Sequence, residues 1–199
     1  MSDASMSSAF PASPWLTPRS PLDDGKLPSG PRFALLDAPP AERFVFRGGE
    51  TARAACSAVF EVELPVRLGP AGQRGERAAL WLGPDEWLLM SEGQSVEALS
   101  AALEAGLEGA PHSLVDVSHR QIGLKVLGAD AARALSAGCP LDLRLKAFPV
   151  GMATRTLLAK AEMVLWRRAG GFHVEVWRSF SDYVTGLLAV IAQDYYPGP

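Results

Sequence analysis

Two hairpin patterns constrain the fold of this chain more than any other feature. Each consists of two apolar runs joined by a tight turn: Gly83–Asp85 interrupts the apolar segment 78–90, and Ala169–Gly171 interrupts 163–177. Glycine, proline and aspartate favour such turns because they fix or release particular backbone angles. The sequence therefore predicts antiparallel strand pairs as the framework of the fold.

Helices are predicted between these strands, from apolar residues at helical spacing and from capping residues. They cover residues 50–60, a segment from Ser91 to Leu107 with Gln94 as capping partner, residues 129–137, and 183–191 after a capping box at Ser179 and Asp182. Single strands are expected at 43–47, 114–117, 122–126 and 154–158, the third of them half-buried, and 69–75 is expected to be a loop. No sequence repeat of 20–50 residues is visible.

This order of elements predicts an α+β fold with antiparallel-rich sheets, helices on one face, and ferredoxin-like units. We expect a single domain over residues 41–199, preceded by an arm at 1–40. The arm contains half of the chain's 16 prolines, which disfavour helices and sheet interiors. It also carries Trp15, Phe33 and Leu35, so it either lies on its own domain or wraps a partner. Deletion of the arm is expected to leave the fold intact and to weaken assembly.

Composition excludes several classes of protein. The chain has 199 residues and 19 Lys+Arg against 22 Asp+Glu, a net charge of −3 that argues against nucleic-acid binding and against an anionic membrane surface. Two cysteines are too few for a disulfide framework, and the N-terminus does not read as a secretory signal. We therefore expect a soluble cytoplasmic protein without nucleic-acid or membrane partners.

No residue pattern predicts a catalytic, cofactor-binding or metal site in this chain. Asp116, Ser118 and His119 have the residue types of a hydrolase triad, but they are too close in sequence to converge easily, and a loop bonded to its own backbone is the simpler interpretation. The histidines lack metal-ligand spacing. Cys56 is interpreted as a small buried apolar residue.

Aromatic residues and arginines instead suggest a binding surface. Tryptophan and arginine are enriched among the residues that anchor protein interfaces. The interface candidates are Trp15, Trp87, Arg120, Trp177 and Arg178. The alternative is that most of the tryptophans are core or cross-strand residues.

Three separated segments, 80–90, 114–143 and 154–188, resemble in their order the gamma subunit of heterotetrameric sarcosine oxidase. The middle segment is also similar to folate-dependent aminomethyltransferases, in which a Gly-Gly-Ile segment leads into two aspartates that serve folate chemistry. Here the corresponding run begins at Ala159 and the acidic pair reads Ala161-Glu162, while Trp177-Arg178 replaces an expected asparagine. An aminomethyltransferase-like fold that has lost its folate site is expected.

The resemblance implies a non-catalytic structural subunit of an oxidoreductase complex. That complex, with alpha, beta and delta subunits, would demethylate sarcosine to glycine with O₂, release H₂O₂ and pass a one-carbon unit to tetrahydrofolate. FAD, FMN, NAD and tetrahydrofolate would belong to the larger subunits and zinc to the smallest. The alternative is a free-standing folate-binding protein or an aminomethyltransferase-like one-carbon transferase.

Overall fold

The computed structural model describes residues 27–194, which form two antiparallel sheets and four α-helices. The first sheet contains β1 (Ala34–Asp37), β3 (Gly69–Pro70), β8 (Gln121–Leu127), β9 (Met152–Leu158), β10 (Ala161–Arg168) and β11 (Gly171–Trp177). The second contains β2 (Glu42–Gly48), β4 (Gly72–Arg74), β5 (Arg77–Gly83), β6 (Glu86–Ser91) and β7 (His112–Asp116). The helices are α1 (Glu50–Phe60), α2 (Val96–Gly106), α3 (Ala131–Ser136) and α4 (Ser181–Gln193), and a 3₁₀ turn, η2 (Arg178–Phe180), precedes α4.

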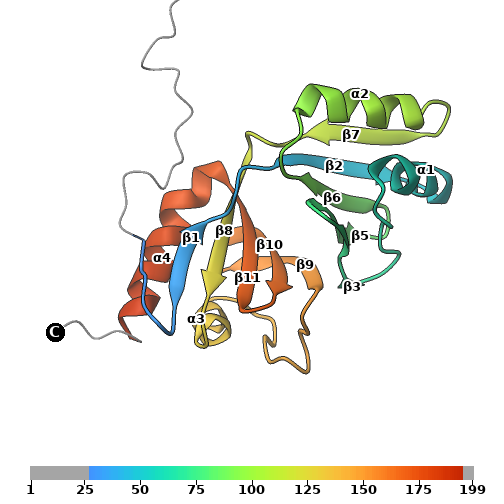
Figure 1. The fold of residues 1–199 in the computed structure, drawn as a ribbon. Coiled ribbons are helices and arrows are strands. Elements are labelled where there is room, and N and C mark those ends of the chain that lie inside the picture. Colours follow the sequence, from blue (N-terminus) through green and yellow to red (C-terminus); the bar gives the residue numbers. More distant parts are fainter. Residues whose placement is uncertain (1–26, 195–199) are drawn as a thin grey trace, which may run out of the picture.

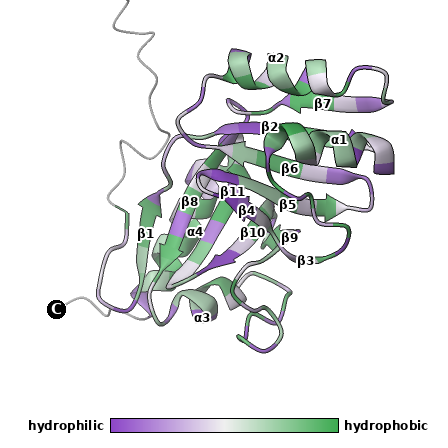
Figure 2. Ribbon diagram, turned by 45° about the vertical axis from the view of Figure 1, so that its right-hand side comes forward, coloured by the Kyte–Doolittle hydropathy of each residue, from purple (hydrophilic) through white to green (hydrophobic). Residues whose placement is uncertain are grey.

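The two sheets pack face to face, with helices on their outer sides (Figure 1). Period-two alternation sends Leu80 and Leu88 into the apolar layer between the sheets, and Trp87 and Leu89 toward α1 and α2. The first sheet buries its outer face against α3 and α4 in the same way. Figure 2 shows α1 and α2 together beside the second sheet, away from α3. The predicted α+β class, with helices on one face of each sheet, is confirmed.

The strand orders are β1-β8-β11-β10-β9-β3 in the first sheet and β4-β5-β6-β2-β7 in the second. In the second sheet, β2-α1-β5-β6-α2-β7 is a ferredoxin-like unit. In the first sheet, β8, β10 and β11 occupy the positions that β2, β5 and β6 occupy in the second sheet. The position of β7, the last strand of the unit, is occupied by β1 from the start of the described chain. The topology therefore repeats although the sequence shows no repeat.

Both predicted hairpins and the helix at 50–60 are confirmed, but several local predictions are wrong. Segment 69–75 contains the short strands β3 and β4. Ser91 ends β6, and α2 begins only at Val96, where the Ser95 hydroxyl accepts a hydrogen bond from the Ala98 amide at 3.2 Å. The first turn before α4 is η2, so Ser179 caps no α-helix.

Strand β8 is also more deeply buried than its alternating sequence indicated. Gln121, Ile122, Gly123 and Leu124 are all buried, because β8 lies between β1 and β11 and its inner face meets the second sheet. Alternating polarity predicted a half-buried strand. Gly123 on its inner face instead makes room for two buried charges, which are described below.

The predicted boundary at residue 40 is wrong for the segment around β1. Phe33 and Leu35 are fully buried in the core of the first sheet, and β1 pairs with β8 as an edge strand. An edge position suits a proline-flanked segment, since only one side of the strand is hydrogen-bonded. Of the two interpretations of the arm, the described part lies on its own domain. Trp15 lies outside the described residues.

Candidate functional site

The inner face of β11 carries the polar and exposed aromatic residues that stand out from the apolar core. Its outer residues Phe172, Val174 and Val176 belong to the core of the first sheet. The alternate residues His173, Glu175 and Trp177 therefore face the other side of the sheet. This face has a cavity at His173, a buried ion pair at Glu175 and an exposed aromatic patch at Trp177.

The buried ion pair joins the two sheets. Arg43 of β2 donates to the Glu175 carboxylate of β11 through Nε at 2.6 Å and Nη2 at 3.0 Å, and His173 Nε2 lies 2.6 Å from Glu175 Oε1. The side chains of Arg43 and Glu175 are 6% and 0% exposed. Burial by itself would raise the pKa of Glu175, but the hydrogen bond and charge of His173, together with Arg43, outweigh it and hold that pKa below its ordinary value.

Gly123 of β8 makes room for this pair. A Cβ atom at this position would lie 2.9 Å from Glu175 Oε1 and 3.0 Å from Arg43 Nη2, and 2.8 Å from the Ala38 Cβ. Any larger side chain would therefore push the sheets or the two charges apart. The glycine inside an otherwise regular strand is explained by this close approach.

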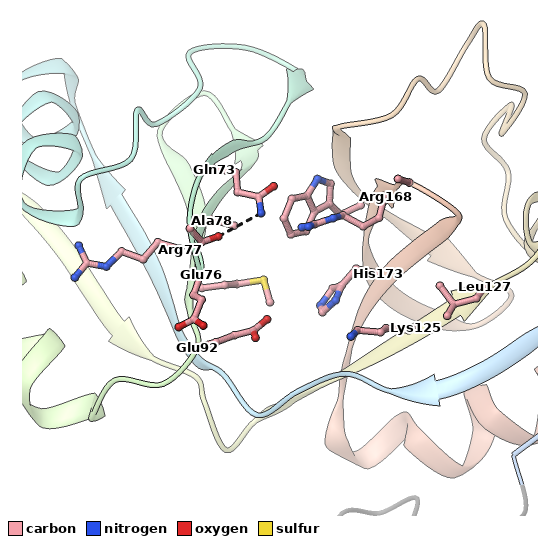
Figure 3. Close-up of a pocket in the computed structure, with 13 residues that line it drawn as sticks. Gln73, Glu76, Arg77, Ala78, Glu92, Lys125, Leu127, Arg168 and His173 are labelled. Atoms are coloured by element: carbon pink, nitrogen blue, oxygen red, sulfur yellow. Dashed lines mark hydrogen bonds between the residues drawn. The ribbon is translucent and has the colours of Figure 1, made fainter.

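A cavity of about 510 Å³ opens between the sheets beside this network (Figure 3). Its floor is the inner face of the first sheet, with Lys125, Trp166, Arg168 and His173. Its roof comes from the β4–β5 turn and β5–β6 of the second sheet, with Glu76, Ala78, Met90 and Glu92. Arg77 is turned away from the cavity, where it donates to the Phe60 carbonyl and to Glu61. The floor is therefore basic and the roof acidic.

Three floor residues are positioned by strand register. Trp166 of β10, His173 of β11 and Lys125 of β8 are cross-strand neighbours in one row. The guanidinium of Arg168 lies 3.9 Å from the centre of the Trp166 ring, and the indole nitrogen of Trp166 donates to the Gly151 carbonyl at 3.1 Å. His173 lines the cavity while its Nε2 atom is held by Glu175.

The exposed aromatic patch lies at the other end of β11. It consists of Trp177, Phe180 and Tyr183, which are 41%, 36% and 40% exposed, with the exposed arginines Arg120 and Arg178 beside them. Arg120 stacks on the Trp177 ring at 5.3 Å, and the Phe180 and Tyr183 rings are 6.5 Å apart. The Arg178 amide also donates to the Arg120 carbonyl at 2.8 Å. We call these five residues the aromatic patch.

The structure thus brings together three interface candidates from sequence, Arg120, Trp177 and Arg178. Trp87 is 1% exposed, and its indole donates to the Pro65 carbonyl at 2.7 Å, so it is a core residue and its prediction as an interface residue is wrong. Its side chain faces α1 and α2 rather than solvent.

Sequence reasoning missed the remaining members of both sites. In the last helix the buried face is made by Val184, Leu188 and Ala192, whereas Tyr183 is 40% exposed. The His-Val-Glu-Val run of β11 contained the signal for the ion pair, because residues two apart share a face of a strand. The run did not reveal that the second sheet covers this face of β11.

The residues that resemble a triad form a local turn, as the simpler interpretation predicted. Asp116 Oδ1 accepts from the Ser118 amide at 2.8 Å and hydroxyl at 2.6 Å, and Ser118 Oγ accepts from the Arg43 amide at 2.9 Å. His119 is exposed. Cys56 is fully buried, and burial raises the pKa of its thiol to about 12. Over residues 27–194, no group of His, Cys, Asp or Glu is arranged to hold a metal ion.

The positions expected to have lost folate chemistry lie apart from the cavity. Ala161 is fully buried, and the Glu162 carboxylate is half-exposed, 3.9 Å from Arg155. Neither lines the cavity. None of the helices within the described part of the chain is both long and apolar enough to cross a membrane.

Comparison with known proteins gives the family. Residues 47–193 match the sarcosine oxidase, gamma subunit family. The chain belongs to this family. It is 39% identical to sarcosine oxidase subunit gamma of Corynebacterium sp. (strain U-96) over 120 residues, which are 60% of this chain and 58% of that protein. The matched region therefore spans somewhat more than half the length of this curated relative.

Solved structures agree with the family assignment. The fold matches a chain of heterotetrameric sarcosine oxidase from Corynebacterium sp. U-96 in complex with pyrrole 2-carboxylate, with a TM-score of 0.79 and 29% identity over 87% of this chain and 90% of that chain. The glycine cleavage system aminomethyltransferase T from Bartonella henselae matches at a TM-score of 0.59 and 13% identity, over 79% of this chain and 45% of that one. The second similarity shows a shared fold alone.

Proposed function

We propose that this chain is a non-catalytic structural subunit of a heterotetrameric sarcosine oxidase. The observation that carries the proposal is the similarity to a chain of such a complex, which extends over 87% of this chain and 90% of the other. Similarity over nearly the whole of both chains indicates a common role more strongly than a short shared motif would.

The proposed partners are alpha, beta and delta subunits, and the complex would work in the cytoplasm. There it would demethylate sarcosine to glycine with O₂, release H₂O₂ and transfer a one-carbon unit to tetrahydrofolate. FAD, FMN, NAD, tetrahydrofolate and zinc would be bound by the partners. Two free, buried cysteines are compatible with a reducing compartment.

The non-catalytic part of the proposal is supported by the residues at the former folate positions. Ala161 has no group that can accept a proton, and the Glu162 carboxylate lies next to Arg155 and does not line the cavity between the sheets. Function depends on such sites and not on the fold that carries them. A chain that keeps the fold without these groups suits a structural role.

The aromatic patch is the proposed contact surface for a partner. Trp177, Phe180 and Tyr183 each expose more than a third of their surface, although aromatic side chains of this size contribute most when buried. The two neighbouring arginines supply donors for carboxylates or carbonyls of a partner. This combination is typical of interface anchors.

Co-expression with the candidate alpha, beta and delta subunits tests the main proposal. A tag on this chain should retain the other three, and all four should elute together with the visible spectrum of a flavoprotein. The proposal is wrong if the chain elutes alone while the other subunits assemble and oxidise sarcosine equally well without it.

Substitution of Trp177 tests the patch. Trp177→Ala should weaken capture of the partners about tenfold or more, as expected of an interface anchor, with little change in the unfolding temperature of the isolated chain. Val66→Ala, at a position that is 67% exposed and outside the patch, is the control and should assemble normally. Normal assembly of the Trp177 variant would remove the patch from the interface.

The alternative of folate chemistry in this chain has a separate test. Tetrahydrofolate is titrated into the isolated chain, and tryptophan fluorescence is followed. Saturable binding that disappears in Glu162→Gln would contradict the non-catalytic proposal and support a folate-binding protein.

A further inference from the structure

The cavity between the sheets is a second feature, separate from the aromatic patch, that the structural role leaves unused. Its volume of about 510 Å³ falls within the range of pockets that hold small molecules, roughly 300–1,000 Å³. A pocket of this size lies beside a buried ion pair that fixes one of its side chains. It therefore has both the room and the rigidity of a binding site.

The floor concentrates groups that bind anions. Lys125 and Arg168 are half-buried cations, and the guanidinium of Arg168 is held in place by stacking on Trp166. His173 is 9% exposed and lines the hollow, and its ring is held by the contact of Nε2 with Glu175. Cations held in position by packing and hydrogen bonds lose little freedom when they bind a carboxylate.

The roof has the opposite charge. The exposed residues Glu76 and Glu92 line it, and the Glu92 side chain extends toward the wall that carries Lys125 and His173 (Figure 3). Among the ion pairs formed by residues 27–194, none joins either carboxylate to Lys125 or Arg168. The charges of the two walls therefore do not neutralise each other through a direct ion pair. Ala78 and Met90 give the space between them an apolar lining.

We propose that this cavity binds a small zwitterion, with its carboxylate on Lys125, Arg168 and His173 and its ammonium group at Glu76 and Glu92. The apolar lining suits an aliphatic spacer between the two charges. A ligand with only one of the charges would satisfy one wall and leave the other solvated, so it should bind more weakly. The proposal concerns the isolated chain and does not depend on its assembly with partners.

The test is a calorimetric titration of the full-length chain with amino acids of increasing length: glycine, 4-aminobutyrate and 6-aminohexanoate. Each of the two longer compounds is compared with its own single-charge relatives, butyrate and butylammonium or hexanoate and hexylammonium. Either 4-aminobutyrate or 6-aminohexanoate should bind saturably. Its affinity should be at least about tenfold higher than that of its own carboxylate and ammonium relatives, as expected when a second charge-assisted contact is added. Absence of binding, or equal binding of the carboxylate alone, would overturn the proposal.

Variants locate the site. Lys125→Met keeps most of the side-chain volume, and Glu92→Gln keeps the shape, so both should fold normally and weaken binding about tenfold or more. Lys146→Met and Glu108→Gln remove the same charges at exposed positions that do not line the cavity, and should leave affinity unchanged. If all four variants bind like the parent chain, the zwitterion binds elsewhere and the proposal is wrong. Since no partner is present, this outcome is independent of the assembly test.

Discussion

The two sheets are built on the same plan, yet they place different polar residues on their inner faces: His173 and Glu175 lie on the first sheet, and Arg43 lies on the second. The order β4-β5-β6-β2-β7 in the second sheet corresponds to β9-β10-β11-β8-β1 in the first. On β6 the inner residues are Leu88 and Met90, whereas on the equivalent β11 they are His173 and Glu175. Both halves share the strand patterns that set the topology, but they differ in the polar residues on their inner faces, and the buried ion pair takes one partner from each half.

The halves also differ in the origin of their last strand. In the second sheet, β7 follows α2 directly along the chain. In the first sheet, its place is taken by β1, whose Leu36 pairs with Lys125 of β8 about ninety residues later. The first sheet is therefore completed by a non-local contact, which has a larger loop-closure cost than a local one.

The largest expected effect comes from breaking the charged contact between the halves. Arg43→Met leaves the Glu175 carboxylate buried with His173 alone, so we expect a loss of about 3–5 kcal/mol of unfolding free energy in urea denaturation. The double variant Arg43→Met, Glu175→Leu removes both charges and should recover at least about half of that loss. Equal stability of the single variant and the parent chain would show that the pair contributes little.

The next largest effect is expected in β1, the strand that completes the first sheet. Leu35 is fully buried and Leu36 is 42% exposed, so the two neighbours form a matched pair. Leu35→Ala should lower the free energy of unfolding by about 2–5 kcal/mol, and Leu36→Ala by about 0.5 kcal/mol or less. Deletion of residues 1–40 should accordingly destabilise the fold, contrary to the expectation from composition. A Leu35 variant as stable as the Leu36 variant would mean that β1 is dispensable.

Acid should act on the buried ion pair between the sheets through the Glu175 carboxylate. The pKa of Glu175 in the folded chain is held below its ordinary value of 4.5, so its contribution to stability is present above that pH and is lost as the pH falls through the folded value. Urea unfolding of the parent chain and of Glu175→Gln should therefore differ most at neutral pH and converge in acid. A difference that stays constant down to acid pH would argue against this origin.

The smallest effect concerns two equivalent turns. Gly75 in the β4–β5 turn has a φ of +58°, and Ala159 in the β9–β10 turn has a φ of +51°. This left-handed region favours glycine, since a side chain there costs about 1 kcal/mol. Gly75→Ala should thus lower the free energy of unfolding by about 1 kcal/mol, and Ala159→Gly should raise it by about 0.5 kcal/mol. Shifts of the same sign would contradict this explanation.

Local patterns allowed much of the fold to be predicted. Both hairpins and α1 depend on residues close together in the sequence, whose spacing and turn chemistry act within a few positions. The first residue of α2 and of α4 was predicted less well. Ser91 and Ser179 each have a possible capping partner three residues later, but other positions in the chain have one too. In the structure Ser91 pairs within β6 and Ser179 lies in η2, so tertiary contacts decided against a helix start at both residues.

The sequence by itself determined the antiparallel hairpins, the α+β class and the resemblance to the gamma subunit family, because each depends on residue order and short-range periodicity. Only the tertiary structure decided that Trp87 is core while Trp177 is exposed, that β1 completes a sheet, and that Arg43 meets Glu175. Those outcomes depend on which strand covers which face. The distance of 132 residues between the two ion-pair partners leaves no local signal from which that could be inferred.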